Sequence, residues 1–259
     1  MCGYRITRRT LVAGGGAFLA ARSAYASDYN PAYPGPVSRA ADQVYDLVVN
    51  DTARGRRIPI LIRHQSRRTS MPVVMFSHGL GGTRDGSDYL MRHWVARGYV
   101  AVFLQHPGSD EAVWRDVPPA RRREALNEAA SIGNAIARMQ DVVVVLDALS
   151  TWQASRDRDL PGDRLDLSRI GMSGHSFGAV TTQAVAGQRV PSAIPGIWPD
   201  PRIRAALLMS PSPPRAMPAA EAFAGVTVPW LIMTGTHDAA PIGGTTPQDR
   251  LAVPVMMSQ

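Results

Sequence analysis

Residues 169–178 read Arg-Ile-Gly-Met-Ser-Gly-His-Ser-Phe-Gly, and this stretch decides the fold of the chain. Its first half is an apolar run that predicts a strand, and a helical pattern begins directly after its last glycine. A strand that turns this sharply into a helix strains the central residue, so the residues two before and two after it must be small. Gly174 and Gly178 occupy those positions around Ser176. The sequence therefore predicts a tight turn that exposes the Ser176 hydroxyl at its tip.

Strand and helix patterns alternate on both sides of this turn. Continuous apolar runs predict strands at residues 73–76, 100–104, 170–172, 205–209 and 230–233, and periodic stretches predict helices at 88–97, 121–149 and 179–187. Residues 45–50 and 58–63 predict two further strands that pair antiparallel at one edge. Strands that are apolar on both faces are typical of a parallel sheet with helices on each side. We therefore expect an α/β fold with a mostly parallel sheet.

A glycine-rich loop follows the strand predicted at 73–76. It reads Ser-His-Gly-Leu-Gly-Gly over residues 77–82. Attack on an ester produces a negatively charged oxygen that needs two preorganised donors, and glycines let backbone amides approach it. Leu80 and Phe177 are the residues whose N–H groups we expect to form this oxyanion hole. A flexible turn is the alternative interpretation, whereas a phosphate-binding loop is excluded because the chain contains no lysine.

The segment Gly-Thr-His-Asp at residues 235–238 follows the last predicted parallel strand. In serine hydrolases with this order of elements, the acid of the catalytic triad lies after the nucleophile and at the end of such a strand. We therefore predict that Asp238 is the acid that serves Ser176. An aspartate that caps a turn is the alternative, because aspartate is favoured in turns.

Together these segments resemble the α/β-hydrolase superfamily, and within it serine esterases similar to platelet-activating factor acetylhydrolase and dienelactone hydrolase. The matching segments are residues 76–81, 98–110, 138–149 and 171–178. The resemblance implies hydrolysis of a small-molecule carboxylic ester through an acyl-serine intermediate, with no cofactor and no metal. The chain departs from both relatives, because the acetylhydrolase has its acid where this chain has Ser210 and dienelactone hydrolases have a cysteine where it has Ser176.

The general-base histidine of the family is missing from its expected place. In the family it follows one more strand and helix after the acid, but no histidine follows His237 in this sequence. We therefore expect the sheet to lack its last strand and helix, the α/β-hydrolase domain over 27–259 to be incomplete at its C-terminus, and catalysis to be impaired. The stretch after Pro247 begins like a helix that Pro254 is expected to break. A non-catalytic relic or binding protein, a thioesterase and a small-polyester depolymerase remain alternatives.

The other histidines are not expected to replace this base. His175 is expected to pack beneath the turn that carries Ser176, and His78 and His106 end strands near the site, where they could line the pocket. His64 and His93 are expected at the surface.

Residues 1–26 have the pattern of an export signal that is removed from the mature protein. Thr-Arg-Arg-Thr-Leu at residues 7–11 resembles the twin-arginine motif, an apolar segment follows it, and Ala-Tyr-Ala at 24–26 fits a cleavage site. We therefore predict a periplasmic or secreted protein.

The composition argues against several other classes of function. Cys2 is the only cysteine, so no internal disulfide can form, and the absence of lysine excludes Schiff-base chemistry. The net charge of +7 depends heavily on four arginines in the first 26 residues, so it gives little support to a nucleic-acid partner. No apolar run reaches the roughly 18 residues of a membrane span, so we expect no stable membrane insertion. The oligomeric state cannot be read from the sequence.

Overall fold

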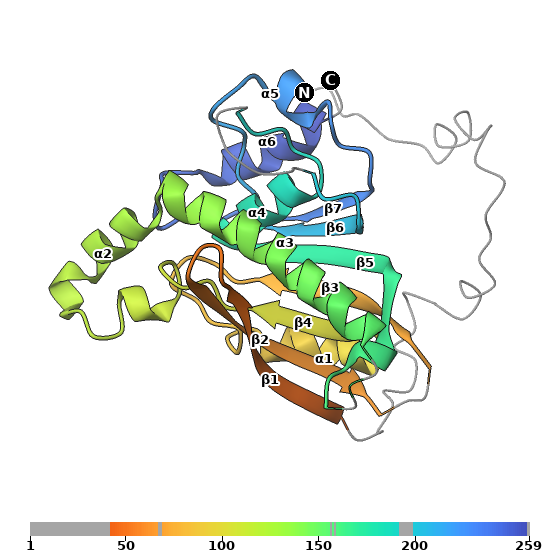
Figure 1. The fold of residues 1–259 in the computed structure, drawn as a ribbon. Helices are drawn as coiled ribbons and strands as arrows, with labels where there is room; N and C mark the ends of the chain where they lie inside the picture. The colour runs from red at the N-terminus through yellow and green to blue at the C-terminus, as the bar shows by residue number, and fades with distance from the viewer. Residues whose placement is uncertain (1–41, 67–68, 156, 158, 192–198, 258–259) are drawn as a thin grey trace, which may run out of the picture. The chain divides into compact units, whose positions relative to one another are not determined.

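The computed structural model describes residues 42–66, 69–155, 157, 159–191 and 199–257. The predicted export signal lies outside the described residues. Within them the chain forms a mixed sheet of seven strands, with helices on both faces (Figure 1).

The strands follow the order β1-β2-β4-β3-β5-β6-β7 across the sheet. β2 pairs antiparallel with β1 and with β4, and all other neighbouring strands are parallel. This topology confirms the predicted α/β fold with an antiparallel pair at one edge. The strand bounds are β1 Asp42–Asp51, β2 Arg56–Gln65, β3 Met71–Ser77, β4 Val100–Leu104, β5 Leu165–His175, β6 Ile203–Met209 and β7 Trp230–Met233.

Alternate residues of the central strand β4 face two separate hydrophobic cores. Val100 and Val102 pack in the larger core, which includes residues of α3 and α4. Ala101 and Phe103 pack in the smaller core, which includes residues of α1. Successive side chains of a strand point to opposite faces, so α1 covers one face of the sheet and α3 with α4 covers the other. Burial on both faces explains why these strands read as continuous apolar runs.

The helix bounds are α1 Asp88–Ala96, α2 Arg122–Ala129, α3 Ile132–Ala154, α4 Phe177–Val185, α5 Ala219–Phe223 and α6 Pro247–Met257. Among the described residues, no single helix combines the length and apolarity of a membrane span, although the segments 119–129 and 132–154 meet both criteria together as a pair bent by 67°.

Two helical predictions differ from the structure. Residues 121–149, predicted as one helix, form α2 and α3 with a break at Ala130 and Ser131. The Ser131 hydroxyl accepts a hydrogen bond from the Asn134 N–H at 3.2 Å, and this side-chain cap begins a new helix. The expected break at Pro254 is wrong, because α6 continues through it to Met257. A proline removes one backbone donor, and the helical bonds on either side of it can remain.

Candidate active site

The sharp turn predicted at Ser176 joins β5 to α4. Ser176 has φ 55° and ψ −114°, a strained backbone conformation for a residue with a side chain. Its N–H donates to the Met209 carbonyl at 2.9 Å, which fixes the turn to the neighbouring strand. A Cβ on Gly174 would lie 2.1 Å from the Gly178 carbonyl oxygen, and a Cβ on Gly178 would lie 1.9 Å from the Ser77 carbonyl oxygen. Both positions therefore require glycine.

The four residues predicted from the sequence line one cleft of about 1010 Å³ at the carboxyl ends of the parallel strands. Leu80 lies in the loop after β3, Ser176 and Phe177 lie where α4 begins, and Asp238 lies after β7. Ligands of open α/β sheets bind at this edge. Much of the wall is apolar and comes from α2, α3 and the loops after β6 and β7: Leu126, Ile132, Ala135, Pro213, Pro214 and Ile242.

The loop that carries Leu80 is anchored through the next residue. The Gly81 N–H donates to the Ser109 carbonyl at 2.9 Å, and the Trp114 indole N–H donates to the Gly81 carbonyl at 2.8 Å. The hydrogen bonds of the described residues leave the Leu80 N–H without an acceptor. The Phe177 N–H has no acceptor within α4, because Phe177 is the first residue of that helix. Both N–H groups are therefore free to bind a ligand oxygen.

Asp238 is a partly exposed carboxylate held by three polar neighbours. The Thr234 hydroxyl donates to its Oδ2 at 3.0 Å, and Arg250 Nε lies 3.5 Å from its Oδ1. Partial burial acts to raise the pKa of Asp238, but hydrogen bonds from Ser210 and Thr234 and the charge of Arg250 together lower it below the ordinary value. Asp238 is therefore ionised at neutral pH.

Sequence reasoning missed two of the residues that hold Asp238. Arg250 of α6 is 2% exposed, and its guanidinium donates to the carbonyls of Ser210, Pro211 and Asp238. Ser210 follows directly on β6 with φ 56°, and Ser176 and Ser210 are the non-glycine residues with positive φ in the described part of the chain. The resemblance does offer a signal for Ser210, because this position carries the acid in the acetylhydrolase. Here the Ser210 hydroxyl is hydrogen-bonded to the carboxylate of Asp238, in the loop after the next strand.

Two of the described histidines line the cleft, and neither is hydrogen-bonded to the Ser176 hydroxyl. His78 and His175 are lining residues, and His175 is exposed rather than packed beneath the turn as expected. Partial desolvation by the surrounding cleft lowers the pKa of His175, while the nearby charge of Asp238 acts in the opposite direction. Among the described residues, no hydrogen bond joins a histidine to the hydroxyl of Ser176.

Comparison with known proteins adds structural matches only. No protein-family model matches the chain, and no curated protein matches its sequence. A suspected dienelactone hydrolase from Klebsiella pneumoniae subsp. pneumoniae MGH 78578 is 16% identical with a TM-score of 0.59, covering 84% of this chain and 81% of that one. A ferulic acid esterase from Streptomyces cinnamoneus is 18% identical with a TM-score of 0.57, covering 86% and 73%. A cold-adapted esterase from an Arctic intertidal metagenomic library is 19% identical with a TM-score of 0.52, covering 83% and 79%.

The chain has the α/β-hydrolase fold. Identities this low show the fold and leave the activity to be argued from the site. In an α/β-hydrolase the nucleophile occupies the turn between a central strand and the next helix, which is the place of Ser176.

A serine, a histidine and an aspartate are hydrogen-bonded to one another beneath the cleft. Ser77 Oγ lies 2.8 Å from His106 Nε2, and His106 Nδ1 lies 2.9 Å from Asp141 Oδ2. These distances are those of a catalytic triad, but all three side chains are fully buried and cannot touch a substrate. The expectation that His106 lines the pocket is therefore wrong, because its ring points into the protein toward the buried carboxylate of Asp141.

Because His106 is buried, we expect the stability of the domain to depend on pH. Full burial, reinforced by the charge of Arg138, lowers the pKa of His106 to about 4, although Asp141 acts to raise it. An unfolded chain has an ordinary histidine pKa of about 6.5, so it binds more protons than the folded chain as the pH falls from there toward about 4. Above a pH of about 6.5 this effect costs no stability. As the pH falls from about 6.5 to about 4, the free energy of unfolding decreases by about 3 kcal/mol in total.

Urea unfolding at about pH 7.5 and about pH 4.5 measures this loss. We expect the free energy of unfolding to be lower at the acidic pH, and to fall less in His106→Gln than in the wild type. Asp141 stays ionised throughout, because hydrogen bonds from His106 and Arg56 lower its pKa far below the ordinary value in spite of its burial. Equal losses in the two proteins would contradict this assignment.

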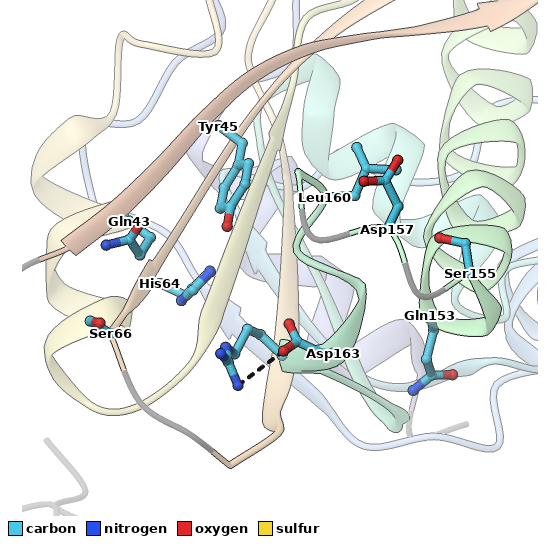
Figure 2. A pocket seen from close by; sticks show the side chains of 10 residues that line it. Gln43, Tyr45, His64, Ser66, Gln153, Ser155, Asp157, Leu160 and Asp163 are labelled. Carbon is cyan, nitrogen blue, oxygen red and sulfur yellow. Dashed lines mark ion pairs between the residues drawn. The ribbon is translucent and has the colours of Figure 1, made fainter.

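A second cavity has a volume of about 660 Å³, and the side chains that line it are drawn in Figure 2. Gln43 and Tyr45 of β1, His64 of β2 and residues that follow α3 line it. The expected surface position of His64 is wrong, because its ring is 1% exposed and stacks on Tyr45 with the ring centroids 5.7 Å apart. The cavity is separate from the candidate active site, because Ser176 follows the carboxyl end of β5 and His64 lies near the start of the parallel strands.

Proposed function

We propose that the chain is a carboxylic ester hydrolase that acts through an acyl-serine intermediate. The observation that carries this proposal is the strained backbone of Ser176, which lines the same cleft as Leu80 and Phe177. Strain of this kind persists where the surrounding structure holds a functional group in place. Solved structures of the same fold that are described as esterases support the same chemistry.

The reaction begins at the Ser176 hydroxyl. Its oxygen attacks the carbonyl carbon of the ester while a base accepts the hydroxyl proton. The Leu80 and Phe177 N–H groups stabilise the negative charge that develops on the carbonyl oxygen. The ester C–O bond then breaks, the proton passes to the leaving alcohol, and the acyl group stays on Ser176. Water attacks the acyl-serine in the same way, which releases the carboxylic acid and restores the serine.

Asp238 supports the proton transfers in this proposal. It is ionised, it lines the cleft, and its orientation is held by Thr234, Ser210 and Arg250. A carboxylate in this position orients an imidazole base and stabilises the imidazolium that forms.

The lining of the cleft indicates the substrate class. The side chains of Leu126, Ile132, Val180 and Ile242 make part of the wall apolar, and the cleft opens to solvent. Such a wall favours small esters with an apolar acyl or alkoxy group, because burial of that group supplies binding energy.

A fluorophosphonate probe tests the proposal without knowledge of the natural substrate. We expect the probe to form a covalent adduct that mass spectrometry locates on Ser176, and to react more slowly with Asp238→Asn. Hydrolysis of a short-chain p-nitrophenyl ester should be blocked by the same adduct. Wild-type protein that neither reacts with the probe nor hydrolyses the ester would overturn the proposal.

A non-catalytic binding protein of the same fold is the second candidate. It is favoured by the observation that no described histidine is hydrogen-bonded to Ser176. For this candidate we expect a short-chain ester to bind in the cleft with equal affinity in wild type and Ser176→Ala, with no labelling of either protein.

A further inference from the structure

Arg138 is a fully buried arginine of α3 that lies beneath the cleft and contacts both segments of the oxyanion hole. Its guanidinium donates to the His78 carbonyl, in the loop that carries Leu80, and lies 4.8 Å from the centre of the Phe177 ring. We propose that Arg138 is a positioning residue for the oxyanion hole, which fixes the direction of the Leu80 and Phe177 N–H groups and places a positive charge beneath them. This inference rests on the proposed esterase function.

The first side of the hole is held through His78. Its Nε2 accepts a hydrogen bond from the His106 backbone N–H at 3.1 Å, so the ring proton is on Nδ1. That Nδ1 lies 2.6 Å from the Gly79 carbonyl oxygen and donates to it, and the Gly82 N–H donates to the same oxygen at 3.1 Å. In a trans peptide the C=O and N–H point in opposite directions. Two donors on the Gly79 carbonyl therefore fix the direction of the Leu80 N–H.

Arg138 holds the same segment through the backbone carbonyl of His78. It donates to the carbonyl of His78, while its NH1 donates to the Ser109 hydroxyl at 2.9 Å. The Ser109 carbonyl is the acceptor of the Gly81 N–H. The residues before and after the Gly79–Leu80 peptide are thus both linked to one buried guanidinium.

The second side of the hole is held through Thr181. Arg138 Nε donates to the Thr181 hydroxyl at 3.1 Å, and that hydroxyl donates to the Phe177 carbonyl at 3.2 Å. The Phe177 ring packs over the guanidinium, a contact that also favours a cation. The first turn of α4 is therefore fixed relative to Arg138.

The buried serine, histidine and aspartate described above keep Arg138 in place. Asp141 is acceptor-only, so His106 donates from Nδ1 and its Nε2 accepts from the Ser77 hydroxyl. The lone pairs of Ser77 are then available to Arg138 NH2 at 3.1 Å. In each hydrogen bond between the Arg138 guanidinium and the Asp141 carboxylate, the donor and the acceptor are therefore fixed.

The charge of Arg138 is placed where an ester hydrolase needs it. Among the described residues, no carboxylate forms an ion pair with Arg138. Burial lowers its pKa to about 9, and Asp141 and Asp110 oppose that effect, so the guanidinium is charged at neutral pH. A fixed positive charge beneath an oxyanion stabilises the negative charge of the transition state more than the neutral ester.

Three variants test the proposal with the full chain and p-nitrophenyl butyrate. Arg138→Lys keeps a charge but cannot reach four partners at once, and we expect kcat to fall about 100-fold with KM changed less than about threefold. Ser77→Ala removes one hydroxyl from the chain, and we expect kcat to fall about tenfold. Ser173→Ala is the matched control, because Ser173 is a buried serine of the adjacent strand whose hydroxyl has no partner among the described residues, and we expect kcat to be unchanged.

A transition-state analogue separates positioning from general destabilisation. The inhibition constant of a phenylboronic acid, which forms a tetrahedral adduct with an active serine, should rise in each variant by the same factor as kcat falls. Lower melting temperatures with kcat and boronate affinity unchanged would overturn the proposal. If Arg138→Lys does not fold, the comparison of Ser77→Ala with Ser173→Ala tests the proposal through the same two measurements, kcat and boronate affinity. A wild type that neither turns over the ester nor reacts with a fluorophosphonate overturns the esterase function itself and this inference with it.

Discussion

Ser176→Ala is expected to lower kcat for a short-chain p-nitrophenyl ester by about 10⁴-fold or more, equivalent to about 5 kcal/mol of activation free energy. The methyl group of alanine cannot form the acyl intermediate, and what remains is the oxyanion hole acting on water. The strained φ of 55° at this position belongs to the turn and not to the hydroxyl, so the variant should keep the fold. Steady-state kinetics and a circular dichroism spectrum measure both expectations.

Ser212→Ala is the matched control for this experiment. Ser212 lines the same cleft, and its hydrogen bonds with Gln183 use the backbone N–H and carbonyl of Ser212. We expect kcat to change less than about threefold, because no catalytic contact is removed. If Ser176→Ala and Ser212→Ala had equal activity, the hydrolysis would not use Ser176.

The local parts of the site could be predicted from the sequence. The turn at Ser176 depends on residues adjacent in the chain, so two glycines at fixed spacing after an apolar run were sufficient to place it. The positions of Leu80 and Asp238 follow from a general rule, because loops after parallel strands meet at one edge of the sheet. The structure places these residues in one cleft, as the rule requires.

The support beneath the site could not be predicted in this way. Ser77, His106, Arg138 and Asp141 lie on three separate segments, and each one reads as an ordinary polar residue at the end of a strand or in a helix. Their contacts depend on the packing of α3 against the ends of β3 and β4, which no local pattern specifies. The buried position of His64 was missed for the same reason, because the ring that stacks on it belongs to Tyr45 of the neighbouring strand.

The second large effect is expected on folding, from Gly178→Ala. A Cβ at this position would lie 1.9 Å from the Ser77 carbonyl oxygen, 2.6 Å from the Ser77 carbonyl carbon and 2.8 Å from the His78 carbonyl oxygen. These are backbone atoms at the end of a central strand, so they cannot move aside as a flexible side chain would. We expect the variant to lose more than about 4 kcal/mol of unfolding free energy, or to accumulate as insoluble protein.

Gly171→Ala separates this steric effect from the general cost of replacing a glycine. Gly171 lies on β5, the strand that leads into the turn before α4, and a Cβ there would approach its nearest neighbours only to 3.9 Å, which is ordinary van der Waals contact. We expect the alanine at 171 to change the urea midpoint little or to raise it, because alanine restricts the unfolded chain more than glycine does.

Because the clash at 178 is with Ser77 and His78, relief of it requires α4 to move away from the oxyanion loop. Any folded Gly178→Ala protein should therefore have lost the proposed esterase activity as well as stability. Equal urea midpoints for Gly178→Ala and Gly171→Ala would contradict the expected clash, because they would show that α4 and the end of β3 leave room for a Cβ at position 178.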